Sequence, residues 1–329
     1  MPDPILLGYL FGGLLLMAVA GDLLVRGALG IGRAMGVSPL VAGIFIVGFG
    51  TSAPEMFISA NAALSGSPGL AIGNIVGSNI ANVLMVAAIP ALLFTYRTGG
   101  AGQGRALFML LLATFIWIGM TAIMPLDPVM GVCFLLVLVG YSGFSIFAAR
   151  RDQIAGRGTG NEEAVTMNPP LWRAIFYAPL GIAGLIFASG FIITGGEGVA
   201  RHFNVPDEWI GLTILALGTS LPEIGAGLAA AFRHRGDVVV GNVLGSNVFN
   251  LLGAGGLVAL FGPFDVAPMF QRYDHWAMGA SVVLLAILIM TRIKMGRLLG
   301  LLLLLLYALY IYGLVSGTNI SALAQMVTG

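Results

Sequence analysis

Residues 50–55 read Gly-Thr-Ser-Ala-Pro-Glu, and the chain repeats this stretch as Gly-Thr-Ser-Leu-Pro-Glu at residues 218–223. A second matching pair follows in each half, Gly-Asn-Ile-Val-Gly-Ser-Asn-Ile-Ala-Asn at 73–82 and Gly-Asn-Val-Leu-Gly-Ser-Asn-Val-Phe-Asn at 241–250. The segments 37–82 and 205–250 align without a gap, which indicates an internal duplication. Each copy places a glutamate, Glu55 or Glu223, beside a proline in an apolar run long enough to cross a bilayer. Carboxylates at that depth mark ion pathways.

The composition is that of a membrane protein. Of the 329 residues, 58% are hydrophobic and only 9% are charged, against about 45–50% and about 25% in soluble globular domains. The formal net charge of +1 argues against nucleic-acid binding, because nucleic-acid-binding proteins carry clustered Lys and Arg. We therefore expect a polytopic protein whose partner is the lipid bilayer.

Apolar runs of about 20 residues predict transmembrane helices. The chain contains ten of them, at 5–27, 38–64, 68–95, 105–124, 128–149, 173–200, 207–233, 237–261, 275–292 and 297–315. The predicted fold is therefore all-α, with ten transmembrane helices. We divide it into a first five-helix repeat (1–150, ion-binding motif 37–82), a cytoplasmic linker (151–172) and a second five-helix repeat (173–329, ion-binding motif 205–250).

The basic residues predict how the chain is threaded. Cytoplasmic loops collect Lys and Arg, and all of these residues except Arg201 and Arg272 fall on one side of the ten-span path. This places both termini outside the cytoplasm and favours a multi-pass protein of the cell (inner) membrane. Five spans per repeat is an odd number, so the second repeat enters the membrane in the opposite sense. Inverted repeats are typical of secondary transporters, whose ion sites lie at the repeat interface near the midplane.

The motifs supply the oxygen atoms that a hard cation requires. Pro54 cannot donate a backbone hydrogen bond, so carbonyl groups one turn earlier, near Gly50 and Thr51, are expected to lack a partner. Pro222 has the same effect in the second copy. Calcium takes roughly 6–8 oxygen ligands. The candidate neutral ligands in the two glutamate motifs are the hydroxyls of Thr51, Ser52, Thr219 and Ser220.

The second pair of motifs is expected to present polar groups on one helix face. Residues four apart share a face, and this spacing relates Asn74, Ser78 and Asn82, and likewise Asn242, Ser246 and Asn250. The glycine pairs Gly73/Gly77 and Gly241/Gly245 allow helices to approach closely.

Two carboxylates at the midplane repel each other, and one divalent ion neutralises both. Glu55 and Glu223 are therefore our candidate metal ligands. An enzyme is not expected, because the histidines lie at or beyond span ends and no metal-hydrolase spacing accompanies either glutamate. A cation channel is a further alternative, but charged rings in channels are built from parallel copies around a pore, unlike inverted halves.

An acid–base pair, Asp22 with Arg26, lies in the first span and is echoed by Glu197 with Arg201 in the sixth. Residues four apart on a helix form such pairs commonly. We interpret both as structural pairs, and the echo as a further sign of duplication.

These motifs resemble the two alpha-repeats of the sodium/calcium exchanger family, within the calcium/cation antiporter superfamily and of the prokaryotic type. The resemblance implies calcium–sodium antiport by alternating access, with no cofactor and no protein partner. It also implies that the first and sixth spans form a long pair that slides over the core.

The resemblance also implies roles for individual residues. Calcium would be bound by Glu55, Glu223 and the main-chain carbonyls of Thr51 and Thr219. The central site would be faced by Asn82 and Asn250. The sodium positions would be formed by the same two glutamates together with backbone oxygens of Gly48 and Ala216 and the side chains of Ser52, Ser78, Ser220 and Ser246.

One position departs from the family pattern. Many sodium-coupled relatives carry an aspartate where this chain has Asn250, so the central cluster holds two carboxylates rather than three. An asparagine there resembles the proton-coupled cation exchangers of the superfamily. Sodium coupling is the favoured hypothesis, and proton-coupled calcium exchange is the alternative.

Overall fold

The fold is given by a computed structural model that describes residues 3–155, 169–203, 218–268 and 270–328. Within these ranges the chain is almost entirely helical, and nine helical stretches are long and apolar enough to cross a membrane. A shorter apolar helix, α11 (Leu221–Phe232), occupies the C-terminal part of the predicted seventh span. The rest of that span, residues 207–217, lies outside the described ranges, as does most of the predicted linker. The prediction of an all-α polytopic membrane protein is confirmed.

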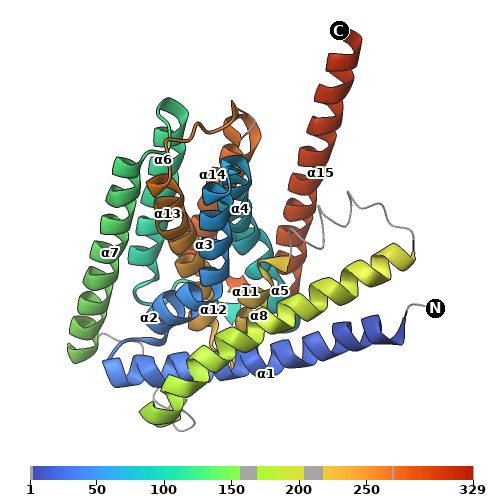
Figure 1. The fold of residues 1–329 in the computed structure, drawn as a ribbon. Coiled ribbons are helices and arrows are strands. Elements are labelled where there is room, and N and C mark those ends of the chain that lie inside the picture. Colours follow the sequence, from blue (N-terminus) through green and yellow to red (C-terminus); the bar gives the residue numbers. More distant parts are fainter. Residues whose placement is uncertain (1–2, 156–168, 204–217, 269, 329) are drawn as a thin grey trace.

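The first and sixth spans, α1 (Pro4–Met35) and α8 (Leu171–His202), form a long pair that lies along one side of the bundle (Figure 1). Their backbones touch at glycines. A Cβ atom on Gly27 would lie 2.4 Å from the backbone nitrogen of Ala178, and one on Gly181 would lie 2.4 Å from that of Leu24. Small residues permit this close approach between membrane helices. The expectation of a long pair is therefore confirmed.

Replacing one of these glycines should separate the pair. We expect Gly27→Leu to lower the free energy of unfolding by about 1–3 kcal/mol, the usual effect of overpacking a tight interface. Thermal unfolding in detergent measures the effect. The matched control is Gly12→Leu on the same helix, because a Cβ atom at Gly12 would meet nothing within 4 Å. An equal loss of stability in both variants would contradict the tight contact.

An ion cluster attaches α1 to the end of α11. The Arg26 guanidinium lies 2.8 Å from the Asp22 carboxylate, as predicted for residues one turn apart. Arg233, the residue that follows α11, contacts the same carboxylate through two nitrogen atoms. The sequence pattern predicts the first contact and not the second, because Arg233 is distant in the chain.

The spans that carry the duplicated motifs form the centre of the bundle. The second span is built from α2 (Pro39–Ala42), the π-helical segment η1 (Gly43–Gly48) and α3 (Phe49–Leu64). The third joins α4 (Pro68–Ala81), η2 (Asn82–Val86) and α5 (Ala88–Leu93), and the eighth joins α12 (Gly236–Val248), η5 (Phe249–Ala254) and α13 (Gly255–Leu260). In the third and eighth spans, 83% and 89% of an 18-residue apolar window are buried inside the protein, the highest shares among the nine long stretches. They therefore form the protein core.

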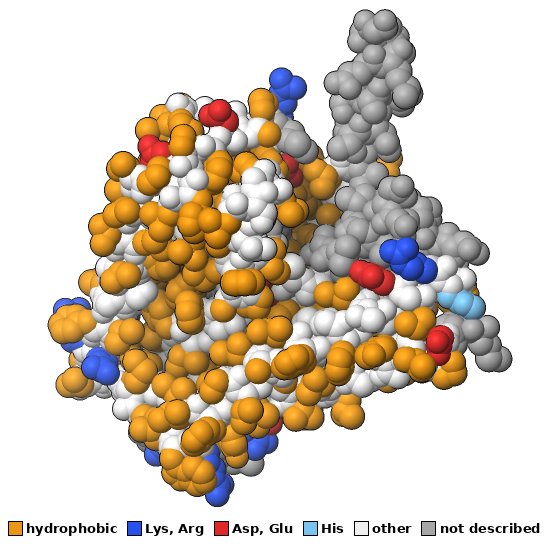
Figure 2. Space-filling view, viewed as in Figure 1, with side chains coloured by type: hydrophobic (Ala, Val, Ile, Leu, Met, Phe, Trp, Pro, Cys, Tyr) orange, Lys and Arg blue, Asp and Glu red, His pale blue; other side chains and the backbone are white. Residues whose placement is uncertain are grey.

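The remaining spans lie outside this core. They are α6 (Gln103–Ile123), α7 (Pro128–Ile154), η6 (Phe270–Asp274) with α14 (His275–Met290), and α15 (Arg297–Thr328). A short ladder, β1 (Tyr96–Arg97) with β2 (Lys294–Met295), ties the end of the third span to the start of the tenth. The visible surface is mainly hydrophobic, and its charged side chains lie near the margins (Figure 2). This is the surface that a lipid environment requires.

Several helices are longer than the apolar runs predict. α1 continues to Met35 rather than to residue 27, and it ends where Gly36 adopts a left-handed conformation with φ of 66°. Glycine is the usual residue at such a helix end. Hydropathy marks only the apolar part of a helix, so it misses turns that extend past the hydrocarbon layer.

Candidate ion-binding site

Glu55 lies in the centre of the bundle on α3. Its side chain is only 1% exposed, and Pro54 lies inside the same helix. The π-helical η1 directly precedes α3. Wider helical turns of this type occur frequently at functional sites, and this one alters the backbone just before Thr51 and Ser52.

Glu223 faces the same centre from the other half of the chain. It is fully buried in the first turn of α11, where Pro222 stands at the helix start. The Ser52 hydroxyl donates to the Glu223 carboxylate at 3.1 Å, a direct bond between the two repeats. Glu55 and Glu223 are also close enough for their charges to act on each other. The structure therefore brings together the two carboxylates that the sequence singled out.

A second polar contact between the repeats surrounds Thr51. Its hydroxyl lies 3.4 Å from the Asn242 side-chain oxygen and 3.5 Å from the Ser246 hydroxyl. The Ser246 hydroxyl donates in turn to the Gly48 carbonyl at 3.4 Å. All of these polar side chains are buried. The side chains of Thr51 and Ser246 and the carbonyl of Gly48 thus lie together, and their role as ion ligands stays a prediction.

The close packing behind this contact comes from one glycine pair. A Cβ atom on Gly241 would lie 2.6 Å from the Leu40 carbonyl oxygen, and one on Gly245 would lie 2.4 Å from that of Ile44. Only glycine allows α12 to approach α2 and η1 so closely. The predicted role in close packing is confirmed for this pair. It is wrong for Gly73/Gly77, where an added Cβ atom would meet only the Phe270 ring at 3.5 Å or nothing within 4 Å.

The two repeats share a hydrogen bond from an asparagine side chain to the main chain of the glutamate. The Asn74 amide donates to the main-chain carbonyl of Glu55 at 3.4 Å, and the Asn242 amide donates to that of Glu223 at 3.1 Å. Asn74 also donates to Ser59 at 2.9 Å. Each asparagine therefore fixes the backbone of the glutamate in its own half. The sequence carried a signal for this role, since both glutamates precede their asparagine by the same number of residues.

Asn82 and Asn250 occupy equivalent places at the start of η2 and within η5. They are 1% and 0% exposed, yet neither side-chain atom of either amide has a hydrogen-bond partner among the described residues. Unpaired buried polar groups are rare because they lose hydrogen bonds to water without replacement. The same is true of one carboxylate oxygen on each of Glu55 and Glu223 and of the Ser220 hydroxyl. Polar atoms that could bind an ion are thus concentrated in the core.

The other predicted ligands lie on the same elements. Ser78 is buried on α4, one turn before Asn82, and Thr219 is half-buried in the turn before α11. Ala216 lies outside the described residues. No group of three or more His, Cys, Asp or Glu side chains that could hold a metal occurs in the described part of the chain. A cation here would need neutral oxygens besides two carboxylates, which is a ligand set that suits calcium or sodium.

Removing the Asn242 amide should weaken the site. In Asn242→Leu the Glu223 carbonyl loses its donor, and leaving a buried group unpaired costs about 1–3 kcal/mol. We expect a corresponding fall in the free energy of unfolding and weaker calcium protection against heat, both measured by thermal unfolding with and without calcium. Asn61→Leu is the control, because Asn61 is an exposed asparagine on α3. Wild-type behaviour of Asn242→Leu would contradict this role.

An all-helical membrane protein with a polar core formed by two related halves belongs structurally with the secondary transporters. The family model for the sodium/calcium exchanger protein matches residues 5–147 and 173–316. The chain therefore belongs to the sodium/calcium exchanger family, and it is a transporter rather than an enzyme. The predicted family is confirmed.

Individual relatives cover nearly the whole chain. CaxA of Alkalimonas amylolytica is 35% identical over 87% of this chain and 89% of its own length. The sodium/calcium exchanger MaX1 of Methanosarcina acetivorans is 28% identical over 91% of this chain and 95% of its own. A structure of the sodium-calcium exchanger NCX_Mj, soaked with zero Na+ and Ca2+, matches with a TM-score of 0.79 at 28% identity and covers 94% of this chain and 99% of that one. The predicted architecture of ten helices in two inverted repeats is thereby confirmed.

Proposed function

We propose that this cation antiporter exchanges calcium for sodium at the Glu55/Glu223 site. The observation that carries the proposal is the pair of buried carboxylates, one from each repeat, each with an unpartnered oxygen. Thr51, Ser52 and Ser246 bring neutral oxygens to the same region through bonds between the repeats. The names of MaX1 and NCX_Mj, both sodium/calcium exchangers, support calcium and sodium as the ions.

Coupling follows from the charge of the site. When no cation is bound, two carboxylates remain in a core that excludes water, and burying uncompensated charge costs several kcal/mol. The change of access would therefore occur with calcium or with sodium bound, and not with an empty site. A transporter that changes access only with an ion bound exchanges calcium for sodium and does not let either ion leak.

The energetics are consistent with several monovalent ions per calcium. Moving calcium against a ten-thousand-fold gradient requires about 5.5 kcal/mol. Each elementary charge that crosses 100 mV supplies about 2.3 kcal/mol. Sodium that enters down its own concentration gradient supplies further free energy. The sodium gradient and a net inward movement of charge are together sufficient to expel calcium.

Proton-coupled calcium exchange is the second candidate, and one residue favours it. Asn250 is uncharged and fully buried at the central site, so the core holds only two carboxylates. A site with less negative charge binds several sodium ions less readily, whereas two carboxylates can exchange protons for calcium.

Transport into proteoliposomes distinguishes the candidates. Purified protein is reconstituted, and uptake of radioactive calcium is followed with a sodium, potassium or pH gradient imposed singly. Sodium coupling predicts uptake driven by an outward sodium gradient alone. Uptake driven only by a pH gradient would replace sodium with protons, and uptake independent of every opposing gradient would refute exchange.

Charge distribution supports a location and an orientation. The basic residues predict that Arg105, Arg150 and Arg297 lie on the cytoplasmic side. Both termini are then on the opposite side of the cell membrane. Single cysteines are introduced near Asp3 and near Arg151 after the native Cys133 is replaced by serine. In intact cells only the first should react with an impermeant reagent.

A further inference from the structure

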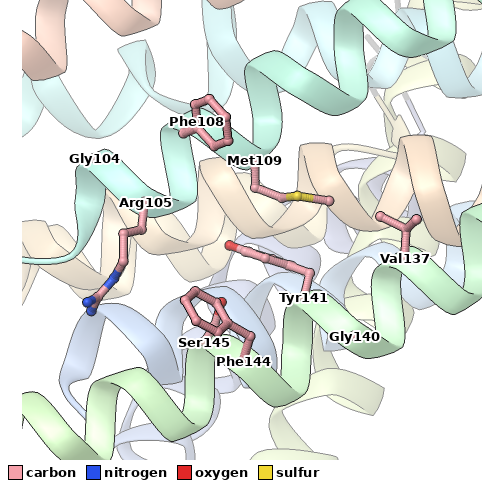
Figure 3. Close-up of a pocket in the computed structure, with 9 residues that line it drawn as sticks. All are labelled: Gly104, Arg105, Phe108, Met109, Val137, Gly140, Tyr141, Phe144 and Ser145. Atoms are coloured by element: carbon pink, nitrogen blue, oxygen red, sulfur yellow. The ribbon is translucent and has the colours of Figure 1, made fainter.

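A groove lies between α6 and α7 (Figure 3), which stand at the edge of the bundle (Figure 1), and neither central glutamate lines it. It encloses about 650 Å³, within the range of about 300–1,000 Å³ that is typical of small-molecule sites. Its floor is open because α7 has a glycine here, Gly140, where an added Cβ atom would meet nothing within 4 Å. A side chain larger than glycine at this position would therefore extend into the groove.

The walls of the groove are apolar and face outward. Phe108 on α6 is 67% exposed, and Val137 and Phe144 on α7 are 47% and 61% exposed. Both helices are membrane-spanning by length and composition. Side chains of this kind at the periphery of a membrane protein contact lipid, so a ligand in the groove enters from the hydrocarbon layer.

One end of the groove is basic. Arg105, in the first turn of α6, lines it, and its side chain is 44% exposed although it contacts Asp152 at 2.7 Å. Arginine has five N–H donors, so one carboxylate does not exhaust its capacity. The Tyr141 ring extends from α7 toward α6 (Figure 3) and lies near enough to Arg105 to be affected by its charge.

The surrounding charges reinforce the basic character. Arg150 and Arg151 lie in the last turns of α7, beside Asp152; neither lines the groove, and Arg150 donates to the Met35 carbonyl at 2.7 Å. Arginines thus outnumber the acidic residue at this end of the two helices. The positive end of the α6 helix dipole adds to the same effect, because anions are favoured at helix N-termini. By the distribution of basic residues, this end lies at the cytoplasmic face.

We propose that the groove between α6 and α7 binds one phospholipid with an anionic headgroup, its phosphate held by Arg105 and an acyl chain lying over Gly140. Basic pockets between transmembrane helices on the cytoplasmic side suit such headgroups. The apolar walls, their outward exposure and the arginine at a single end together match a molecule with one charged end and a long apolar tail. A soluble anion would match the arginine only.

Native mass spectrometry of the full-length protein in detergent tests the site. Retention of phosphatidylglycerol is compared with retention of phosphatidylcholine for wild type and four variants. Arg105→Gln removes the headgroup contact, and Arg297→Gln is its control at an exposed arginine that starts α15. Gly140→Leu fills the groove, and Gly143→Leu is its control, because Gly143 is also on α7, also opens on empty space, and does not line the groove. Thermal unfolding of each variant checks folding.

Wild type should retain phosphatidylglycerol about fivefold more strongly than phosphatidylcholine, since one interfacial arginine contributes about 1 kcal/mol. Arg105→Gln should abolish this preference, whereas Gly140→Leu should reduce retention of both lipids, and both controls should behave as wild type. Equal retention of the two lipids by wild type would overturn the proposal. So would wild-type retention by Gly140→Leu, or a dimer mass that is lost in Gly140→Leu and kept in Gly143→Leu.

Discussion

Glu55→Gln and Glu223→Gln should each reduce calcium exchange at least a hundredfold while leaving the protein folded. Glutamine keeps the shape of the side chain and removes its charge, so the remaining glutamate faces a divalent ion alone. Removing one partner of a buried pair of opposite charges, here the carboxylate that faces calcium, costs roughly 3–5 kcal/mol, and about 2.7 kcal/mol already corresponds to a hundredfold. Calcium uptake into proteoliposomes under a sodium gradient measures the loss.

The control for these variants is Asp237→Asn. Asp237 is an acidic residue at the start of α12 that pairs with Arg235 at 2.9 Å and is 36% exposed. Its removal should leave exchange near the wild-type rate. Strong calcium transport by either glutamine variant, with normal thermal unfolding, would remove the central assignment.

Asn250→Asp should strengthen the response to sodium. The substitution places a third carboxylate in a core that already holds Glu55 and Glu223, and it does so without changing side-chain volume. A carboxylate attracts a sodium ion more strongly than a neutral amide does, and a gain of about 1.4 kcal/mol would lower the sodium concentration for half-maximal exchange about tenfold. Sodium-dependent calcium flux, measured over a range of sodium concentrations, tests this.

Asn247→Asp is the matched control for that change. Asn247 is equally buried in the same span, on α12, but its amide donates to the Val243 carbonyl at 2.7 Å. A carboxylate there should disturb folding without increasing the response to sodium. An unchanged sodium dependence in Asn250→Asp would mean that this position does not contact the ion, and that the departure from the family pattern has no effect on coupling.

Much of the architecture could be predicted from the sequence, because two strong constraints act on it. The bilayer requires long apolar helices, and charge inside it is too costly to be incidental. These constraints identify the spans and the pair Glu55 and Glu223, and duplication supplies an independent check. The role of these residues in ion binding remains a prediction, whereas their proximity is now a structural finding.

Other features could not be predicted from residue patterns. The π-helical segments η1, η2 and η5 depend on which of two nearby carbonyls each amide selects, and neighbouring helices decide this. The bond from Ser52 to Glu223 and the contact from Arg233 to Asp22 join residues far apart in the chain. Such contacts depend on the relative height of the packed helices, which hydropathy does not specify.

The glycine contacts between α1 and α8 have a mechanical consequence. Because the backbones meet at Gly27 and Gly181, we expect the two helices to move together as one unit. One helix belongs to each half of the chain, so a displacement of this pair would act on both repeats at once.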